Sequence, residues 1–156
     1  MSSETLLPGP DASVTLREIT SDTLQSIIDL KVSPEQEQFV AANVVSIAQA
    51  YFYRDILWFR AIYADEIPVG FVMVAENPAE QEWFLSRLMI DARYQGRGYG
   101  ERALQLVIDG LRSRGATELQ TSCGPGEGSP CPFYERRGFV DTGDFHGKER
   151  VLRLLL

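Results

Sequence analysis

The chain has 156 residues, an apolar fraction of 44% and a formal net charge of −7. This length predicts one domain with a substantial hydrophobic core. The negative charge argues against binding to nucleic acid, whose phosphates require a basic surface, and it suits a cationic small molecule. No apolar run approaches the roughly 18 residues that a membrane helix needs, so no membrane association is expected.

Residues 1–12 are rich in Ser, Pro and Gly and lack the basic start and apolar centre of a secretory signal. They predict a flexible tail before a single domain over residues 13–156, in a cytoplasmic protein. In that compartment Cys123 and Cys131 are expected to be reduced. With one histidine, His146, the chain offers too few ligands for zinc, and no metal is expected.

The first part of the domain predicts one strand and two helices. Residues 13–19 alternate apolar and polar side chains, as a strand does. A helix is predicted over residues 21–30 and a longer one over residues 33–52, which begins with Ser33 as cap and Pro34 in the first turn. The buried stripe of the longer helix is expected to be Val40, Val44, Ile47 and Tyr51.

The remaining residues continue the alternation of strands and helices. Residues 57–76 predict a hairpin with its turn at Asp65-Glu66, and residues 82–90 predict a central strand. A helix should follow Gly100 and end near Gly115, before a strand over residues 116–123. A loop, a short helix closed by Gly138 and a final hairpin complete the order β-α-α-β-β-β-α-β-α-β-β.

Three glycines, Gly96, Gly98 and Gly100, lie between the central strand and the following helix. A helix beginning there has N–H groups without internal partners, which together with the helix dipole favour an anion such as phosphate. Arg93 and Arg97 would add positive charge at the rim. The loop lacks the Gly-Lys-Ser/Thr end of a Walker loop, and its Gly-x-Gly-x-Gly spacing is not that of a dinucleotide fingerprint.

Two motifs in this part of the chain resemble those of the GNAT N-acetyltransferase superfamily. The stretch RYQGRGYG contains Gln95-x-x-Gly98-x-Gly100, and FYERRGF places Tyr134 four residues before Gly138-Phe139. The resemblance extends from about Val14 to the C-terminus. It implies an α/β (α+β) fold with a mixed, mostly antiparallel sheet of about seven strands, flanked by about four helices and splayed at its central strands.

The resemblance also implies acetyl-CoA as cosubstrate and assigns the residues that hold it. The backbone at the end of the central strand would bind the pantetheine arm, and the glycine loop would bind the pyrophosphate. The residues concerned are Leu88, Met89, Ile90, Gln95, Gly96, Arg97, Gly98, Tyr99, Gly100 and Glu101. Many family members have Asn seven residues before the tyrosine, where this chain has Glu127, whose carboxylate cannot donate the amide hydrogen bond. Either backbone or Ser129 replaces that amide, or this part of the cofactor site differs, and Glu127 and Ser129 are both candidate cofactor contacts.

Catalysis and the acceptor are predicted by the same resemblance. Tyr134 occupies the position of the family's general acid, which protonates the departing thiolate. An alkylamine acceptor has a pKa of about 10 and must lose a proton before it attacks the thioester. Glu82 is one candidate base. Glu35 and Glu37 are other candidates, and they are also expected to contact the acceptor.

The stretch LKVSPEQEQFVAANVVSIAQAYF resembles the bacterial spermine/spermidine (diamine) branch of the superfamily, which implies transfer of acetyl to a polyamine. Two alternatives stay open. The acceptor could be an aminoglycoside-type antibiotic, an amino acid or a protein N-terminus, or the chain could be a CoA-binding regulatory module without turnover. The apolar end VLRLLL either pairs across a homodimer interface or completes the sheet.

Overall fold

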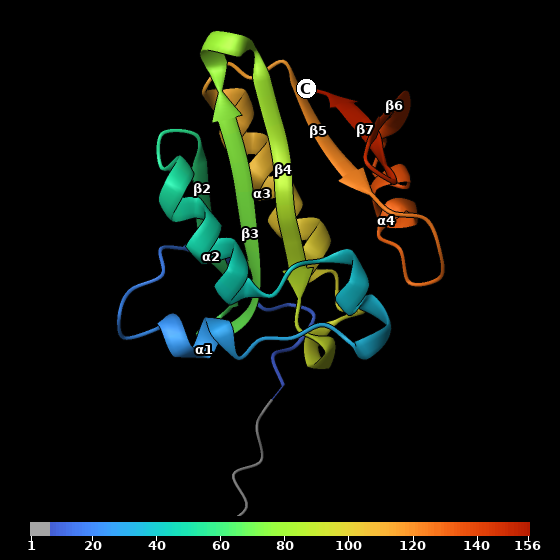
Figure 1. Cartoon of the computed structure of the whole chain (residues 1–156). Coiled ribbons are helices and arrows are strands. Elements are labelled where there is room, and N and C mark those ends of the chain that lie inside the picture. Colours follow the sequence, from blue (N-terminus) through green and yellow to red (C-terminus); the bar gives the residue numbers. More distant parts are fainter. Residues whose placement is uncertain (1–6) are drawn as a thin grey trace, which may run out of the picture.

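Seven strands form one mixed sheet in the computed structural model, which describes residues 7–156 (Figure 1). The strands are β1 (Val14–Arg17), β2 (Leu57–Ala64), β3 (Ile67–Asn77), β4 (Glu82–Ile90), β5 (Glu118–Cys123), β6 (Val140–His146) and β7 (Glu149–Leu155). The α-helices are α1 (Leu24–Ile28), α2 (Asn43–Ala50), α3 (Tyr99–Ser113) and α4 (Cys131–Glu135). Short 3-10 helices are η1 (Pro34–Phe39), η2 (Tyr51–Tyr53), η3 (Pro78–Glu80) and η4 (Ala92–Tyr94).

The strand order is β1-β2-β3-β4-β5-β7-β6, and every neighbouring pair is antiparallel except β4 and β5. The parallel pair follows from the chain, because α3 carries it from the end of β4 back to the start of β5. The predicted hairpin turn at Asp65 is present, and Asp65 has a positive φ of 52°. The fold class predicted from the sequence is confirmed.

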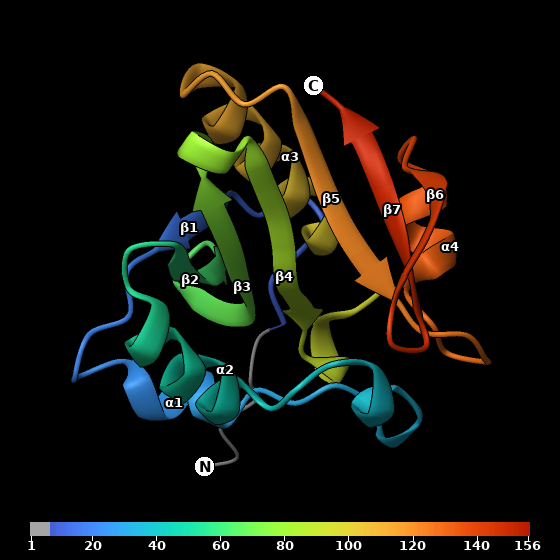
Figure 2. The ribbon, with the colours of Figure 1, turned by 45° about the horizontal axis from the view of Figure 1, so that its top comes forward.

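Helices cover both faces of the sheet (Figure 2): α1 and α2 lie on one face, and α3 and α4 lie on the other. Each face has its own core. The predicted apolar stripe of α3 is buried against the second face through Ala103, Leu104, Val107, Ile108 and Leu111. The first core joins Ile27 and Leu30 to side chains of β2, β3 and β4. The sheet is therefore a rigid platform between two layers.

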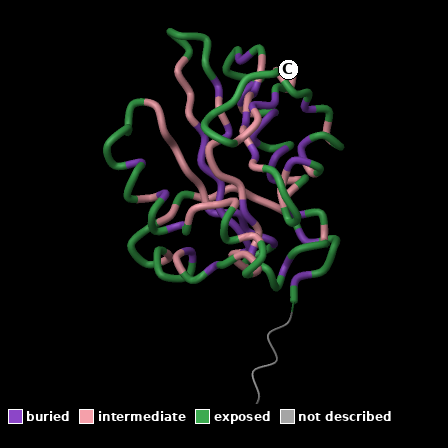
Figure 3. Tube along the Cα trace, turned by 45° about the vertical axis from the view of Figure 1, so that its right-hand side comes forward, coloured by how far each residue is buried: buried purple, intermediate pink, exposed green. Residues whose placement is uncertain are grey.

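Burial is concentrated in the central strands, whereas the edge formed by β6 is mostly exposed (Figure 3). Pro68 lies near the start of β3, opposite Tyr63 where the β2–β3 register shifts, a position at which proline is tolerated in a strand. None of the helices in residues 7–156 is long and apolar enough to cross a membrane.

The continuous helix predicted over residues 33–52 is wrong. The segment forms η1, then an extended residue at Val40 with φ −143° and ψ 135°, and then α2. This interruption changes the helical phase. Asn43 is buried because its side-chain amide donates to the carbonyl of Ile27, 2.9 Å away, so the buried face contains Asn43, Ser46 and Ala50. Val44 and Tyr51 of the predicted stripe are exposed.

Residues 8–12, which belong to the segment predicted as a flexible tail, are hydrogen-bonded to the domain. The hydroxyl of Tyr99 donates to the carbonyls of Pro8 and Gly9 at 2.8 and 2.7 Å, and Arg102 donates to the carbonyl of Ala12 at 2.6 Å. These bonds attach residues 8–12 to the first turns of α3. Residues 1–6 of the predicted tail lie outside the described residues.

Candidate active site

A slot opens between β4 and β5 because the two strands pair over only two positions. Phe84 lies opposite Gln120 and Leu85 opposite Thr121, and beyond these pairs the strands diverge (Figure 2). At the point where β4 and β5 begin to diverge, the hydroxyl of Thr121 donates to the carbonyl of Leu85, 2.9 Å away. The backbone of residues 86–90 therefore has no β5 partner, as the predicted splay requires, and can bind an extended ligand.

The slot is part of a cavity of about 810 Å³, a size typical of small-molecule and cofactor sites. Its walls come from η1, β4, the glycine loop, the first turn of α3, β5, α4 and β7. The predicted residues that line it are Glu37, Leu88, Met89, Ile90, Gln95, Gly96, Gly98, Tyr99, Gly100, Glu101, Ser129 and Tyr134. The cavity thus brings together both sequence motifs.

The glycine loop begins α3 with two left-handed residues. Gly96 has φ 79° and Gly98, which caps the helix, has φ 81°. A Cβ at either position would meet nothing within 4 Å, so glycine is required there by backbone conformation and not by lack of space. The resulting turn leaves the first N–H groups of a 15-residue helix at the cavity, which suits an anion.

At the end of the cavity beside the glycine loop, positive charge comes from two residues that were not predicted from the sequence. Arg136 and Arg137, which follow α4, both line the cavity. Arg137 is held by an ion pair with Glu101 at 3.2 Å and donates to the carbonyl of Phe133 at 2.8 Å. The carboxylate of Glu101 therefore holds the guanidinium of Arg137 in place at the cavity. The signal in the sequence is the Arg-Arg pair inside the tyrosine motif.

The two arginines predicted at the rim have other partners. Arg93 forms an ion pair with Asp91, 2.8 Å from nitrogen to oxygen. Arg97 donates to the carbonyl of Pro8 at 3.2 Å and does not line the cavity. The side chains of both arginines are thus directed to groups outside the cavity, and their place around the anion stays a prediction.

Asp91 directly follows β4 and fixes the position of the loop. The residue is 4% exposed, and its carboxylate accepts hydrogen bonds from the backbone N–H groups of Lys31 and Arg93, both at 2.9 Å. Burial raises the pKa of Asp91, but these donors and the Arg93 guanidinium outweigh burial and hold the pKa below its usual value. The carboxylate thus joins the segment before η1 to the start of the glycine loop.

Gln95, the first residue of the glycine motif, connects the same two segments. Its side-chain amide donates to the carbonyl of Ile90 and to the side-chain oxygen of Gln36, both at 2.8 Å. The end of β4, the loop and η1 are therefore one hydrogen-bonded unit beside the cavity.

Tyr134 extends from α4 into the core beside the slot and is 5% exposed. Burial raises its pKa to about 12; a hydrogen bond with Thr121 lowers it and the nearby charge of Glu149 raises it further. The phenol therefore keeps its proton at neutral pH and can donate it to a group in the slot.

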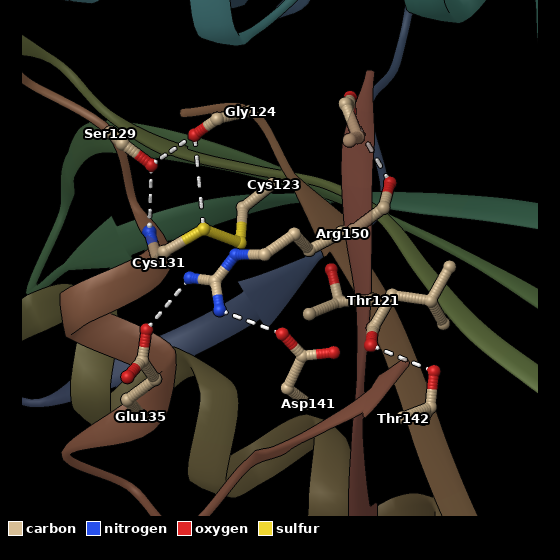
Figure 4. Close-up of a disulfide and its surroundings, with 12 residues drawn as sticks. Thr121, Cys123, Gly124, Ser129, Cys131, Glu135, Asp141, Thr142 and Arg150 are labelled. Carbon is tan, nitrogen blue, oxygen red and sulfur yellow. Dashed lines mark hydrogen bonds and ion pairs between the residues drawn. A yellow bond between two sulfur atoms is a disulfide. The ribbon is translucent and has the colours of Figure 1, made fainter. Parts of the chain in front are cut away.

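A disulfide joins Cys123 at the end of β5 to Cys131 at the start of α4 (Figure 4), so the expectation of two reduced thiols is wrong for this structure. The intervening loop brings the two Cα atoms to 5.5 Å, within the range that a disulfide spans. Ser129 reinforces the closure, since its hydroxyl donates to the carbonyl of Gly124 and accepts from the N–H of Cys131. Glu127, in the same loop, does not line the cavity.

The carboxylates predicted near the acceptor are only partly brought to the site. Glu37 of η1 lines the cavity, whereas Glu35 does not. Glu82 is the first residue of β4 and is exposed; the cavity begins at Phe84, so Glu82 lies beyond its edge. A carboxylate that the sequence did not indicate, Glu149 at the start of β7, lines the cavity instead.

Comparisons with known proteins agree with this geometry. The acetyltransferase (GNAT) family profile matches residues 22–139. The chain belongs to the GNAT acetyltransferase family. It is an acetyl-CoA-dependent acetyltransferase, whose splayed strands, helix N-terminus and buried tyrosine form the expected cavity.

Individual relatives cover nearly the whole chain. The chain is 28% identical to a spermine/spermidine N(1)-acetyltransferase of Bacillus subtilis, over 92% of this chain and 99% of the relative. The PaiA N-acetyltransferase of Thermoplasma acidophilum, solved with coenzyme A, superimposes with a TM-score of 0.73 at 16% identity, over 92% of this chain and 99% of that one. An acetyltransferase of Thermus thermophilus superimposes with a TM-score of 0.74 at 22% identity, over 92% of this chain and 97% of that one.

The described residues, 7–156, contain no group of three or more His, Cys, Asp or Glu side chains placed to hold a metal ion.

Proposed function

We propose that this acetyltransferase transfers acetyl from acetyl-CoA to a primary amine of a polyamine such as spermidine or spermine. The observation that carries the proposal is the pair of carboxylates, Glu37 and Glu149, on the walls of the cavity. They would attract a polycation, as would the net charge of −7. The name of the Bacillus subtilis relative supports the same acceptor class.

The residues have distinct roles in this proposal. The backbone of Leu88, Met89 and Ile90 binds the pantetheine arm, since their side chains pack in the two cores. The N–H groups from Gly96 to Glu101 bind the pyrophosphate, with charge from Arg136 and Arg137. Tyr134 donates its proton to the sulfur as the amine attacks the thioester directly.

One observation favours a second acceptor class, an amine that also carries a carboxylate, such as an amino acid. Arg87 of β4 lines the cavity, and its Nε is buried without a hydrogen-bond partner. Within residues 7–156 it forms no ion pair with a carboxylate. An acceptor carboxylate would supply that partner.

A kinetic screen separates the two classes. The purified chain is assayed with acetyl-CoA and spermidine, spermine, putrescine, an aminoglycoside and a set of α-amino acids, and thiol release is followed. The highest kcat/KM is expected for spermidine or spermine. Turnover confined to amino acids would replace the polyamine by the second class, and acetyl-CoA binding without turnover of any amine would favour a regulatory module.

A further inference from the structure

Glu149 is the cavity carboxylate best placed to meet the acceptor amine. The hydroxyl of Ser122 donates to it at 3.3 Å. A Cβ built on Gly124 would lie 4.0 Å from the Cγ of Glu149 and 3.6 Å from the ring of Phe39, so the glutamate side chain points toward η1. Glu149 therefore borders the slot on the face of the sheet that carries α1, η1 and α2.

Tyr134 borders the same slot from the opposite face. It belongs to the core under α3 and α4, and its partner Thr121 precedes Ser122 in β5. Because neighbouring residues in a strand point to opposite faces, Thr121 meets the phenol and Ser122 meets Glu149. An acid and a carboxylate thus lie on the two sides of the place where β4 and β5 separate.

Among residues 7–156, no cationic side chain balances the charge of Glu149. It is half-buried and forms no ion pair with any residue from 7 to 156. The next residue, Arg150, points to the other face and binds Glu135 and Asp141 (Figure 4). A half-buried carboxylate whose hydrogen bond comes from a neutral hydroxyl, and which has no ion pair, favours a bound cation.

The other charged groups around Glu149 come from three elements. His146 lies opposite it in the β6–β7 hairpin and stacks on Phe84. Arg87 and Glu37 line the same cavity from β4 and η1. The carboxylate of Glu37 would also attract the ammonium group of the acceptor, whereas the positive charge of Arg87 would repel an ammonium group placed beside it. Together these charges favour a position of the attacking amine close to Glu149.

We propose that Glu149 is the catalytic base that removes the proton from the acceptor ammonium. The proposal rests on acetyl transfer to an amine, and it does not depend on which amine. The carboxylate accepts one ammonium proton; the free nitrogen then bonds to the acetyl carbon and loses its second proton as the carbon–sulfur bond breaks. Tyr134 protonates the sulfur and is reprotonated from solvent, which receives the second nitrogen proton, and Glu149 then returns its proton to solvent. The products are the amide, CoA thiol and one net proton.

The test compares wild type, Glu149→Gln and the matched control Glu80→Gln, whose side chain is exposed on η3 away from the cavity. Glu149→Gln is expected to lower kcat by about 10²-fold or more and to abolish the acidic limb of the pH profile. Its defect should shrink with a fluorinated analogue of the same amine, which is less basic and arrives without the proton. By calorimetry, its CoA complex should bind the amine several-fold more weakly, while acetyl-CoA affinity stays unchanged.

The outcomes separate this inference from the proposed function. If wild type prefers an amino acid to polyamines, the polyamine proposal fails, and Glu149→Gln is measured with that amino acid. If wild type acetylates polyamines and Glu149→Gln keeps the wild-type kcat and pH profile, only the assignment of Glu149 fails. A defect of equal size for the basic and fluorinated amines also overturns the base role.

Discussion

At the scale of single residues, the phenol of Tyr134 is the group whose chemistry the structure defines most closely. Replacing it with phenylalanine keeps the ring and removes the proton. We expect Tyr134→Phe to lower kcat by about 10²-fold, because the thiolate would leave without a proton donor. Acetyl-CoA affinity should change little, since the glycine loop that we propose binds the pyrophosphate lies on a different element and the substitution leaves Arg136 and Arg137 in place. Steady-state kinetics and calorimetry measure the two quantities.

Tyr63→Phe is the matched control, because Tyr63 is a buried tyrosine of the core beneath α1 and α2 and does not line the cavity. Wild-type turnover in Tyr134→Phe would remove the phenol from the mechanism. Tyr134 could be predicted because it lies within a local motif. Glu149 could not be predicted in this way, because no local motif surrounds it. It reaches the cavity only because β7 pairs with β5, and this pairing joins residues far apart in the chain.

At the scale of elements, the disulfide links the strand that forms one wall of the slot to the helix that carries the phenol. It closes a sequence separation of 8 residues. Cross-linking a loop of this length restricts the unfolded chain and is worth about 2–3 kcal/mol. Adding a reductant should therefore lower the free energy of unfolding by that amount, measured by urea denaturation, and should also lower kcat because α4 is less firmly placed.

The double variant Cys123→Ala/Cys131→Ala should show the same lower stability and no response to reductant. Identical urea midpoints for oxidised and reduced wild type would contradict the prediction. The spacing of the cysteines could not reveal the bond, because a disulfide depends on where a loop returns and not on its length alone.

Local signals predicted most elements but not how neighbouring helices share one core. The periodicity of α3 and the Ser33-Pro34 start of η1 are properties of a few adjacent residues, and both predictions agree with the structure. The break at Val40 depends instead on Asn43 reaching the carbonyl of Ile27 in α1. That contact lies between two helices, so the polar residue that is buried cannot be recognised from helical spacing.

At the scale of the whole molecule, the resemblance carried by the two motifs predicted a mixed sheet that is splayed at its central strands, and the structure has this splay at the parallel β4–β5 pair. The motifs did not predict how the N-terminal layer is attached to the site. That attachment passes through Asp91, which accepts from Lys31 and Arg93, and through Gln95, which binds Gln36. The cavity wall formed by η1 is thereby tied to the glycine loop.

Asp91→Asn tests this attachment through its pH dependence. The folded pKa of Asp91 lies below the unfolded value of about 3.9, so its ionised form stabilises the fold above that pH, and the stabilisation is lost as pH falls through the folded pKa. We expect the variant to lose about 1–3 kcal/mol of unfolding free energy at pH 7, because hydrogen bonds to a charged group weaken. Urea denaturation should show the gap between wild type and variant narrowing as pH falls below about 4. A gap that stays constant down to acid pH would mean that packing, and not the charge of Asp91, joins the two layers.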